Sequence, residues 1–281
     1  MNTGRCLCGG VTWELAAEPF QAFNCHCKLC RKAHGTAFGT YWFMRQGELR
    51  MTGGEDITVD YRSSHMLVRR FCGVCGSVVP YAGEADDQHV VAPGGCHDDG
   101  KPSDCNIFVP HGAPWHEVTG DLPRHDDYPP ETGYPRVEED PVPPPPPGVV
   151  RGWCMCGRVA FRTTGPYRSA WNCHCSLCRR GRAAAHSSNG LIDIQHLDFT
   201  QGIDHLKSFR VPGTQYHTQV FCEVCGSKMP YVVSEHAWAI VPLGILEDDP
   251  GIRPGVHIFV GSKAAWHDIT DDLEQHDGAA S

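Results

Sequence analysis

The cysteines are the residues best able to do chemistry in this 281-residue sequence, which contains 16 of them. Most fall into three motifs, a CxC pair, a CxCxxC set and a CxxC pair, and this order occurs twice. The first copy comprises Cys6 and Cys8, then Cys25, Cys27 and Cys30, then Cys72 and Cys75; the second comprises Cys154 and Cys156, then Cys173, Cys175 and Cys178, then Cys222 and Cys225. Thiols at such short spacings chelate metal ions, so we predict metal binding.

Each copy of seven thiols divides naturally into four plus three. Two chelating pairs that lie far apart in sequence, one CxC and one CxxC, are the usual ligands of a closed tetrahedral zinc site with four thiolates. Gly9 and Gly76 follow these pairs and allow the backbone to turn so that its amides approach the sulfurs. The CxCxxC set supplies three ligands and leaves one exchangeable position, which is typical of a catalytic or ligand-binding zinc. We therefore predict up to two zinc ions per copy.

Two alternatives remain for the thiols. In the first alternative, the three-cysteine set gains a fourth protein ligand, such as His26, His34 or Cys105, and becomes a second structural zinc site. Otherwise the thiols form an extracellular disulfide framework, which the odd number of motif cysteines per copy disfavours. Cys96 and Cys105 have no counterpart in the second copy, and we interpret them as small buried hydrophobic residues.

Cations follow both three-cysteine sets. Lys28, Arg31 and Lys32 follow the first set, and Arg179, Arg180 and Arg182 follow the second. Positive charge beside an anionic metal site lowers the free-energy cost of gathering thiolates there, and it also binds the carboxylates of an incoming ligand. We predict that Lys28, Arg31, Arg179 and Arg180 bind substrate, and the alternative is that they form the solvated face of a short helix.

The sequence is a tandem duplication. The cysteine motifs recur at an offset of 148 to 150 residues, and Ile107-Phe108-Val109 recurs as Ile258-Phe259-Val260 at 151. Five consecutive prolines at 143–147 favour an extended polyproline II spacer between the copies. We predict a first zinc domain at residues 1–127, a proline-rich linker at 128–149 and a second zinc domain at 150–281.

The residue pattern within each copy is mostly that of β-structure. Short apolar runs bounded by Gly, Pro and Asp predict strands at 11–15, 78–81, 90–91 and 107–109, and at 159–161, 238–241 and 258–260 in the second copy. Helix is sparse, with one short helix expected after each CxCxxC and a turn near 264–266. The predicted fold class is mainly β, with two tandem zinc-binding antiparallel domains.

These motifs resemble a known family. The order CxCG, NCHCxxCR, FCxxCGS and HIFV, with WHDIT toward the end, is similar to that of the glutathione-dependent formaldehyde-activating enzymes, a family that includes centromere protein V. The resemblance covers residues 1 to about 126 and 151 to 277. It implies a β-tent fold, a structural zinc on the CxC and CxxC cysteines, and a catalytic zinc on the three-cysteine sets.

The implied activity is a carbon–sulfur lyase reaction in its synthetic direction, in which glutathione and formaldehyde condense to S-hydroxymethylglutathione. The three-cysteine sets would be catalytic, with His26 and His174 as general acids that pass a proton to the new hydroxyl. The alternative role for these two histidines is a hydrogen bond that orients the ligand loop. The second copy keeps the family's C-terminal pattern better, because Asn106 in the first copy stands where His257 stands in the second.

The charge and hydropathy exclude other function classes. The net charge of −9 and the lack of a basic tail argue against nucleic acid, and no apolar run reaches the ~20 residues of a membrane span. The N-terminal residues lack an apolar segment, which predicts a cytoplasmic protein. The expected partners are a small thiol such as glutathione and an aldehyde, the oligomeric state is open, and the competing hypothesis is a non-catalytic zinc module that binds a protein or small thiol.

Overall fold

The structure is a computed structural model that describes residues 2–65, 67–83, 86–133, 142–215 and 217–280. It is mainly β, as predicted, and its two halves repeat one plan of three sheets. In the first half the sheet orders are β1-β2-β5, β10-β3-β4-β9-β8 and β6-β7. The strands are β1 (Asn2–Arg5), β2 (Thr12–Leu15), β3 (Gln21–Cys25), β4 (Gly39–Arg45), β5 (Leu49–Gly53), β6 (Thr58–Arg62), β7 (Val68–Cys72), β8 (Tyr81–Gly83), β9 (Asp86–Pro93) and β10 (Cys105–Ile107).

The second half repeats this arrangement with one added strand. Its sheet orders are β11-β12-β15, β18-β19-β14-β13-β20-β21 and β16-β17. The strands are β11 (Val150–Trp153), β12 (Ala160–Thr163), β13 (Ser169–Cys173), β14 (Ser187–Asp193), β15 (Leu197–Gln201), β16 (Leu206–Arg210), β17 (Thr218–Cys222), β18 (Tyr231–Val233), β19 (Trp238–Pro242), β20 (Val256–Ile258) and β21 (Glu274–Gln275). The shared topology is what a duplication predicts.

Each half has one α-helix in its described residues, α1 (Lys28–His34) and α2 (Ser176–Arg182). Both helices begin inside the CxCxxC motif, so the third cysteine lies in the first turn. The helix ends at a residue in the left-handed region, Gly35 with φ 65° in the first half and Ala183 with φ 54° in the second. Short 3-10 turns are η1 (Glu55–Ile57), η2 (Gly94–Cys96), η3 (Val109–His111), η4 (Pro130–Thr132), η5 (Ile194–His196), η6 (Ile203–His205), η7 (Ser234–His236), η8 (Leu243–Ile245) and η9 (Val260–Ser262).

Three details of the predicted β-structure are wrong. The sheets are not wholly antiparallel, because β10 pairs with β3 and β20 pairs with β13 in parallel. The strands expected at 107–109 and 258–260 end at Ile107 and Ile258, since Phe108 and Phe259 adopt φ 58° and 57°, which breaks the ladder. The run at 78–81 forms a single bridge at Val78 before β8 begins.

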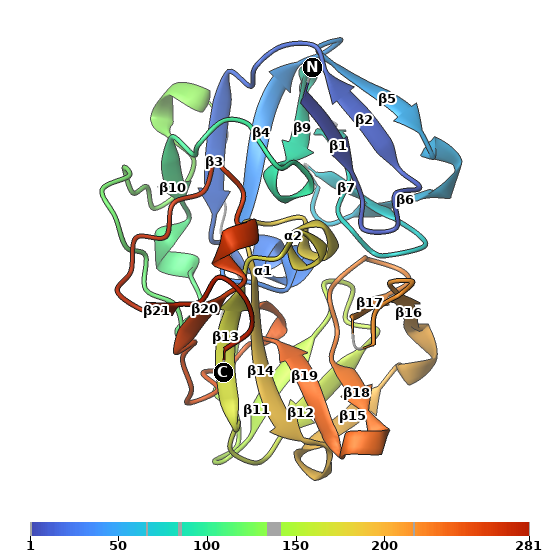
Figure 1. The fold of residues 1–281 in the computed structure, drawn as a ribbon, viewed down its shortest axis with the longest axis vertical. Coiled ribbons are helices and arrows are strands. Elements are labelled where there is room, and N and C mark those ends of the chain that lie inside the picture. Colours follow the sequence, from blue (N-terminus) through green and yellow to red (C-terminus); the bar gives the residue numbers. More distant parts are fainter. Residues whose placement is uncertain (1, 66, 84–85, 134–141, 216, 281) are drawn as a thin grey trace.

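The two halves lie one above the other, with α1 and α2 side by side at their junction (Figure 1). Helix α1 packs against η8 of the second half, and α2 packs against η2 of the first. Gly95 and Gly244 make this approach possible. A Cβ on Gly95 would lie 2.0 Å from the backbone of Ala184, and a Cβ on Gly244 would lie 2.3 Å from the backbone of Thr36. One hydrophobic core therefore includes residues from both halves.

The predicted linker is described only in part. Residues 142–149 form neither helix nor strand, and residues 134–141 lie outside the described residues. Four of the five consecutive prolines are exposed, and the carbonyl of Pro143 accepts a hydrogen bond from Arg151. Tyr128, at the start of the predicted linker, packs its ring against Phe108 at 4.9 Å between centroids.

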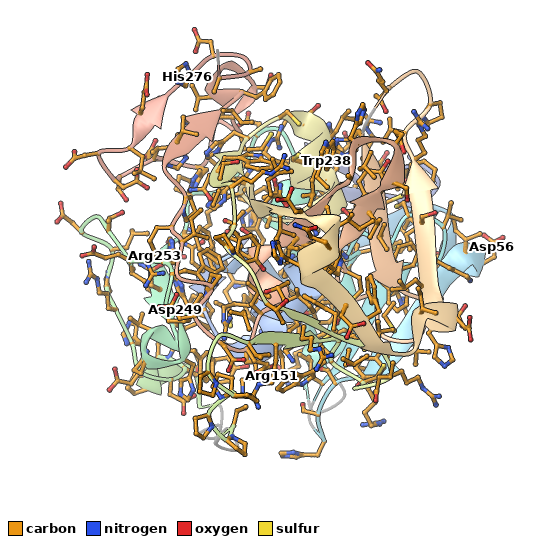
Figure 2. The ribbon with its side chains drawn as sticks, turned by 90° about the horizontal axis from the view of Figure 1, so that it is seen from below. Asp56, Arg151, Trp238, Asp249, Arg253 and His276 are labelled. Atoms are coloured by element: carbon orange, nitrogen blue, oxygen red, sulfur yellow. The ribbon has the colours of Figure 1, made fainter. Side chains whose placement is uncertain are left out.

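Some of the charged side chains lie on the outer surface and others are buried. Asp56 and the ion pair of Asp249 with Arg253, whose closest atoms are 2.7 Å apart, lie on the periphery of the view in Figure 2. In the described part of the chain, no helix has both the length and the apolar character that a membrane crossing requires.

Candidate metal centres

The first four-cysteine cluster joins two distant turns. Cys6 and Cys8 follow β1, and Cys72 and Cys75 lie at the end of β7 and in the turn after it. All four sulfurs lie within 4.8 Å of one another, with Cys6 Sγ–Cys8 Sγ at 3.4 Å and Cys8 Sγ–Cys72 Sγ at 3.7 Å. A tetrahedron with metal–sulfur bonds of about 2.3 Å has sulfur–sulfur edges of about 3.8 Å. The four thiols therefore fit one tetrahedral metal ion.

The second cluster repeats this geometry. Cys154 Sγ–Cys156 Sγ is 3.4 Å and Cys156 Sγ–Cys222 Sγ is 3.8 Å, and Cys225 completes the group. The glycines after the pairs behave as predicted, because Gly9, Gly76, Gly157 and Gly226 all have φ between 71° and 76°. Backbone amides reach the sulfurs, as in the 3.3 Å contacts of the Val11 and Val159 N–H groups with Cys6 and Cys154. All 16 cysteines are free thiols.

Protonation within these clusters also favours a cation. Hydrogen bonds from Cys6 and Cys72 lower the pKa of Cys8 to about 7, and those from Cys154 and Cys222 lower the pKa of Cys156 to about 7. Contacts with the other thiols, above all the hydrogen bond with Cys72, raise the pKa of Cys6 well above that of a free thiol. Neutral thiols thus solvate a few thiolates, and a divalent cation lets all four lose their protons together.

The three-cysteine clusters, which we call triads, are built at the N-termini of α1 and α2. The sulfurs of Cys25, Cys27 and Cys30 lie within 4.8 Å of one another, as do those of Cys173, Cys175 and Cys178. Cys27 and Cys175 are the N-cap residues, and their sulfurs accept the N–H of Cys30 at 3.5 Å and of Cys178 at 3.3 Å. This cap places the second and third thiols of each motif on the same turn, beside the thiol at the end of the preceding strand.

No fourth ligand joins either triad among the described residues. His34, one of the candidates, uses Nε2 for the hydroxyl of Tyr41 and Nδ1 for the carbonyl of Arg182, both at 2.6 Å. Cys105 is buried in β10 and belongs to no cluster, and Cys96 is buried with its sulfur 3.7 Å from the carbonyl of Val78. Each triad therefore has three protein donors, and its fourth coordination position is not taken by a His, Cys, Asp or Glu side chain of the described residues.

Arg69, which the sequence analysis missed, lies beside the first triad. Its Nη2 donates to Cys30 Sγ at 3.4 Å and its Nη1 donates to the hydroxyl of Tyr41 at 2.8 Å. The side chain is 5% exposed, and no carboxylate pairs with it among the described residues. Hydrogen bonds from Cys25 and Cys27 hold the pKa of Cys30 well below that of a free thiol, and Arg69 adds to this effect. The buried guanidinium is thus balanced by thiolate charge.

The second triad obtains its cation from a different position. Gln219 stands where Arg69 stands in the first half, 150 residues earlier, and Arg182 stands where His34 stands. Arg182 is buried, its Nη2 donates to Asn189 Oδ1 at 3.0 Å, and its Nη1 has no hydrogen-bond partner among the residues that the structure describes. Burial lowers the pKa of Arg182 to about 10, and the charge of Cys178 opposes this. Besides the buried arginines that directly follow the triads on α1 and α2, each triad therefore has a further buried guanidinium in its neighbourhood, that of Arg69 or Arg182.

The two predicted proton carriers are buried inside the triad loops. His26 Nε2 is 3.0 Å from Asn106 Oδ1, and because that oxygen only accepts, Nε2 carries the proton. His174 Nε2 is 2.8 Å from His257 Nδ1, and His257 Nε2 is 3.0 Å from the carboxylate of Asp271. Burial lowers the pKa of both His26 and His174. The Nδ1 atoms of both rings are buried, and neither has a hydrogen-bond partner within the described part of the chain.

The cations that follow the triads have partners within the chain. Arg179 and Arg180 donate to the two oxygens of Asp98 at 2.7 and 2.5 Å, and Arg31 Nη1 is 3.5 Å from the carbonyl oxygen of Leu246. Lys28 lies 3.5 Å from Glu247, which also pairs with Lys32. These contacts join one half to the other, and Asp98 and Glu247 are equivalent positions 149 residues apart. A role of these four cations in substrate binding stays a prediction.

Known proteins of one family are similar to both copies of the motifs. The sequence matches the family model described as glutathione-dependent formaldehyde-activating enzyme over residues 1–111 and again over 149–262. A Halomonas elongata protein that carries this enzyme name provisionally is 29% identical over 134 residues, which are 43% of this chain and 81% of that protein. A crystal structure of a Rhodobacter sphaeroides protein is 23% identical with a TM-score of 0.26, over 32% of this chain and 82% of that chain.

Proposed function

The chain belongs to the glutathione-dependent formaldehyde-activating enzyme family, and from this premise we propose that it joins a small thiol such as glutathione to an aldehyde such as formaldehyde. The product would be S-hydroxymethylglutathione, and the enzyme would be a zinc-dependent carbon–sulfur lyase acting in the synthetic direction. The observation that supports this most is the pair of triads, each with three convergent sulfurs and a buried cation nearby. Residues 1–127 and 150–281 are the two domains of this proposal, joined by a linker at 128–149.

Zinc suits the donor set of all four clusters, because compact groups of thiols select this ion. We propose Cys6, Cys8, Cys72 and Cys75 as one structural site and Cys154, Cys156, Cys222 and Cys225 as the other. The triads would hold the catalytic ions, and zinc bound there would supply Lewis acidity that favours the thiolate form of an incoming thiol.

The chemical step forms one bond and moves one proton. The incoming thiol loses its proton and its sulfur attacks the aldehyde carbon, the C=O π electrons move to oxygen, and that oxygen takes the proton that the thiol released to become the hydroxyl. Arg69 in the first half and Arg182 in the second balance the negative charge that gathers at the triads. His26 and His174 remain our candidates for moving the proton, with Nε2 protonated and Nδ1 as the acceptor.

The test is to mix the protein with glutathione and formaldehyde and follow adduct exchange by NMR. We expect acceleration by the natural protein and its loss in the double variant Cys27→Ser plus Cys175→Ser, which removes one partly exposed thiol from each triad. Cys96→Ser is the matched control, because Cys96 is a buried thiol outside all four clusters. A natural protein with no acceleration would remove this activity and favour the non-catalytic zinc module.

Arg69→Gln is expected to weaken zinc retention at the first triad by about 10- to 100-fold, the usual cost of losing a group that holds a metal ligand. Gln219 occupies the same place in the second half, so the fold accepts glutamine there. The measurement is zinc release to a competing chelator in a Cys175→Ser background, where the first triad is intact. Equal retention with and without Arg69 would mean that the guanidinium serves packing alone.

A further inference from the structure

A cavity of about 370 Å³ lies between the two halves. Its walls come from equivalent positions of the two copies, such as Asn24 and Asn172, and the hydroxyls of Thr119 and Thr270 meet across it at 2.5 Å. None of the 14 motif cysteines lines it. The cavity is therefore a feature of the paired halves that contains no motif cysteine, and it adjoins the first triad through His26, which lies between Cys25 and Cys27.

Five imidazoles line this cavity: those of His26, His116, His186, His257 and His267. The rings of His186 and His267 are 5.8 Å apart between centroids, and those of His26 and His116 stack at 5.9 Å. Burial lowers the pKa of both His116 and His267 to about 3 and that of His186 well below its usual value. These three rings are neutral at pH 7 and present lone pairs as hydrogen-bond acceptors.

The charges around the cavity disfavour an anionic ligand. Asp121, Asp268 and Asp271 line it, and no lysine or arginine does so among the described residues. Lys263, which is close to His267, donates its ammonium to the backbone carbonyl of His267 at 2.6 Å. A carboxylate or phosphate would face three carboxylates without a lining cation.

The geometry also disfavours a metal ion. Within the described ranges, the groups whose donor atoms all lie within 4.8 Å consist of cysteines alone. The imidazoles and carboxylates of the cavity therefore surround a space and do not converge on one point, as metal ligands must. The space instead suits an organic ligand, with Phe38 and Trp266 as aromatic walls.

We propose that this cavity binds a small organic ammonium compound. An ammonium group carries only donors, and the cavity offers acceptors on its carboxylates, neutral imidazoles and threonine hydroxyls. Phe38 and Trp266 add aromatic rings to the lining, and such rings suit both the positive charge and the apolar part of an organic ammonium compound. Asp271 is the principal anchor: it lines the cavity, and its carboxylate is already oriented because it accepts from His257 and from the N–H of Leu273.

The experiment compares three probes of the same skeleton with the zinc-loaded full chain at pH 7: benzylamine, benzyl alcohol and benzoate. We expect saturable 1:1 binding of benzylamine by NMR titration, weaker binding of the alcohol and none of benzoate. Asp271→Asn should weaken the binding of benzylamine at least tenfold. Asp268 is an exposed residue of the cavity lining, and Asp268→Asn should weaken the binding of benzylamine severalfold. This variant tests the proposal if Asp271→Asn does not fold.

Asp56→Asn is the control, because it removes the same charge from an exposed position that does not line the cavity. Benzoate binding as tightly as benzylamine, no saturable binding of the amine, or unchanged affinity in both cavity variants would each overturn the proposal. So would loss of binding in Cys27→Ser plus Cys175→Ser, which would place the amine at the triads. Because that double variant should keep the amine site while losing adduct formation, the proposed function and this site can fail separately.

Discussion

Cys72→Ser is expected to unfold the first half of the protein, and Cys222→Ser the second. Each change removes one of four sulfurs that fit a single tetrahedral metal ion. Binding of zinc by four thiolates contributes on the order of 10 kcal/mol to folding in small metal-dependent domains. That is comparable to the whole stability of a typical domain, about 5 to 15 kcal/mol. Far-ultraviolet circular dichroism and the zinc content of the purified variants measure the effect.

The matched controls are Cys27→Ser and Cys175→Ser in the triads. These thiols cap short helices and are partly exposed, and because serine retains the cap, their replacement should cost less than about 1 kcal/mol, the scale of one lost helix cap. Serine keeps an oxygen that accepts the same N–H. If cluster and triad variants melt at the same temperature, the division of each copy into four structural and three reactive thiols is mistaken.

The sequence alone could predict the thiol clusters because their spacing is local. Two or three cysteines within six residues must lie near one another, and the duplication repeats the pattern, which separates it from chance. The same holds for α1 and α2, whose caps are residues of the motif itself. The mainly β fold followed from short apolar runs, but the parallel pairs β3–β10 and β13–β20 join strands about 80 residues apart and leave no local signal.

Arg69 shows what the sequence could not reveal. It is one of 24 basic residues and lies on β7, far from the triad in sequence. A signal exists only in the comparison of the copies: arginine and histidine at positions 69 and 34 become glutamine and arginine at 219 and 182. This exchange keeps one guanidinium near each triad and makes sense only once the fold brings β7 beside α1.

The contacts of the charged residues at the junction of the halves could not be predicted from the sequence either. Helix α1 carries three basic residues whose side chains looked free to bind a ligand. The structure instead turns Lys32 toward Glu247 and toward the ring of Trp153, 4.6 Å away. Since both partners belong to the other half, single-copy reasoning predicts a solvated or substrate-binding cation where the duplicated chain has an internal contact.

Glu247→Gln is expected to destabilise the protein by about 3 to 5 kcal/mol, the usual cost of breaking a buried ion pair. The side chains of Lys32 and Glu247 are 3% and 1% exposed, so the ammonium would be left in the junction without an opposing charge. Burial already lowers the pKa of Lys32, and the Glu247 carboxylate is the group that opposes this. Urea unfolding of the zinc-loaded chain measures the change.

Asp98→Asn provides the comparison within the same molecule, because Asp98 is the equivalent residue on the other side of the junction. It also pairs with two cations, Arg179 and Arg180, but its side chain is 65% exposed. Water can therefore take over part of its role, and its loss should cost about 1 kcal/mol. Equal costs for the two variants, or a larger cost for Asp98→Asn, would contradict the expectation that burial sets the strength of these two contacts.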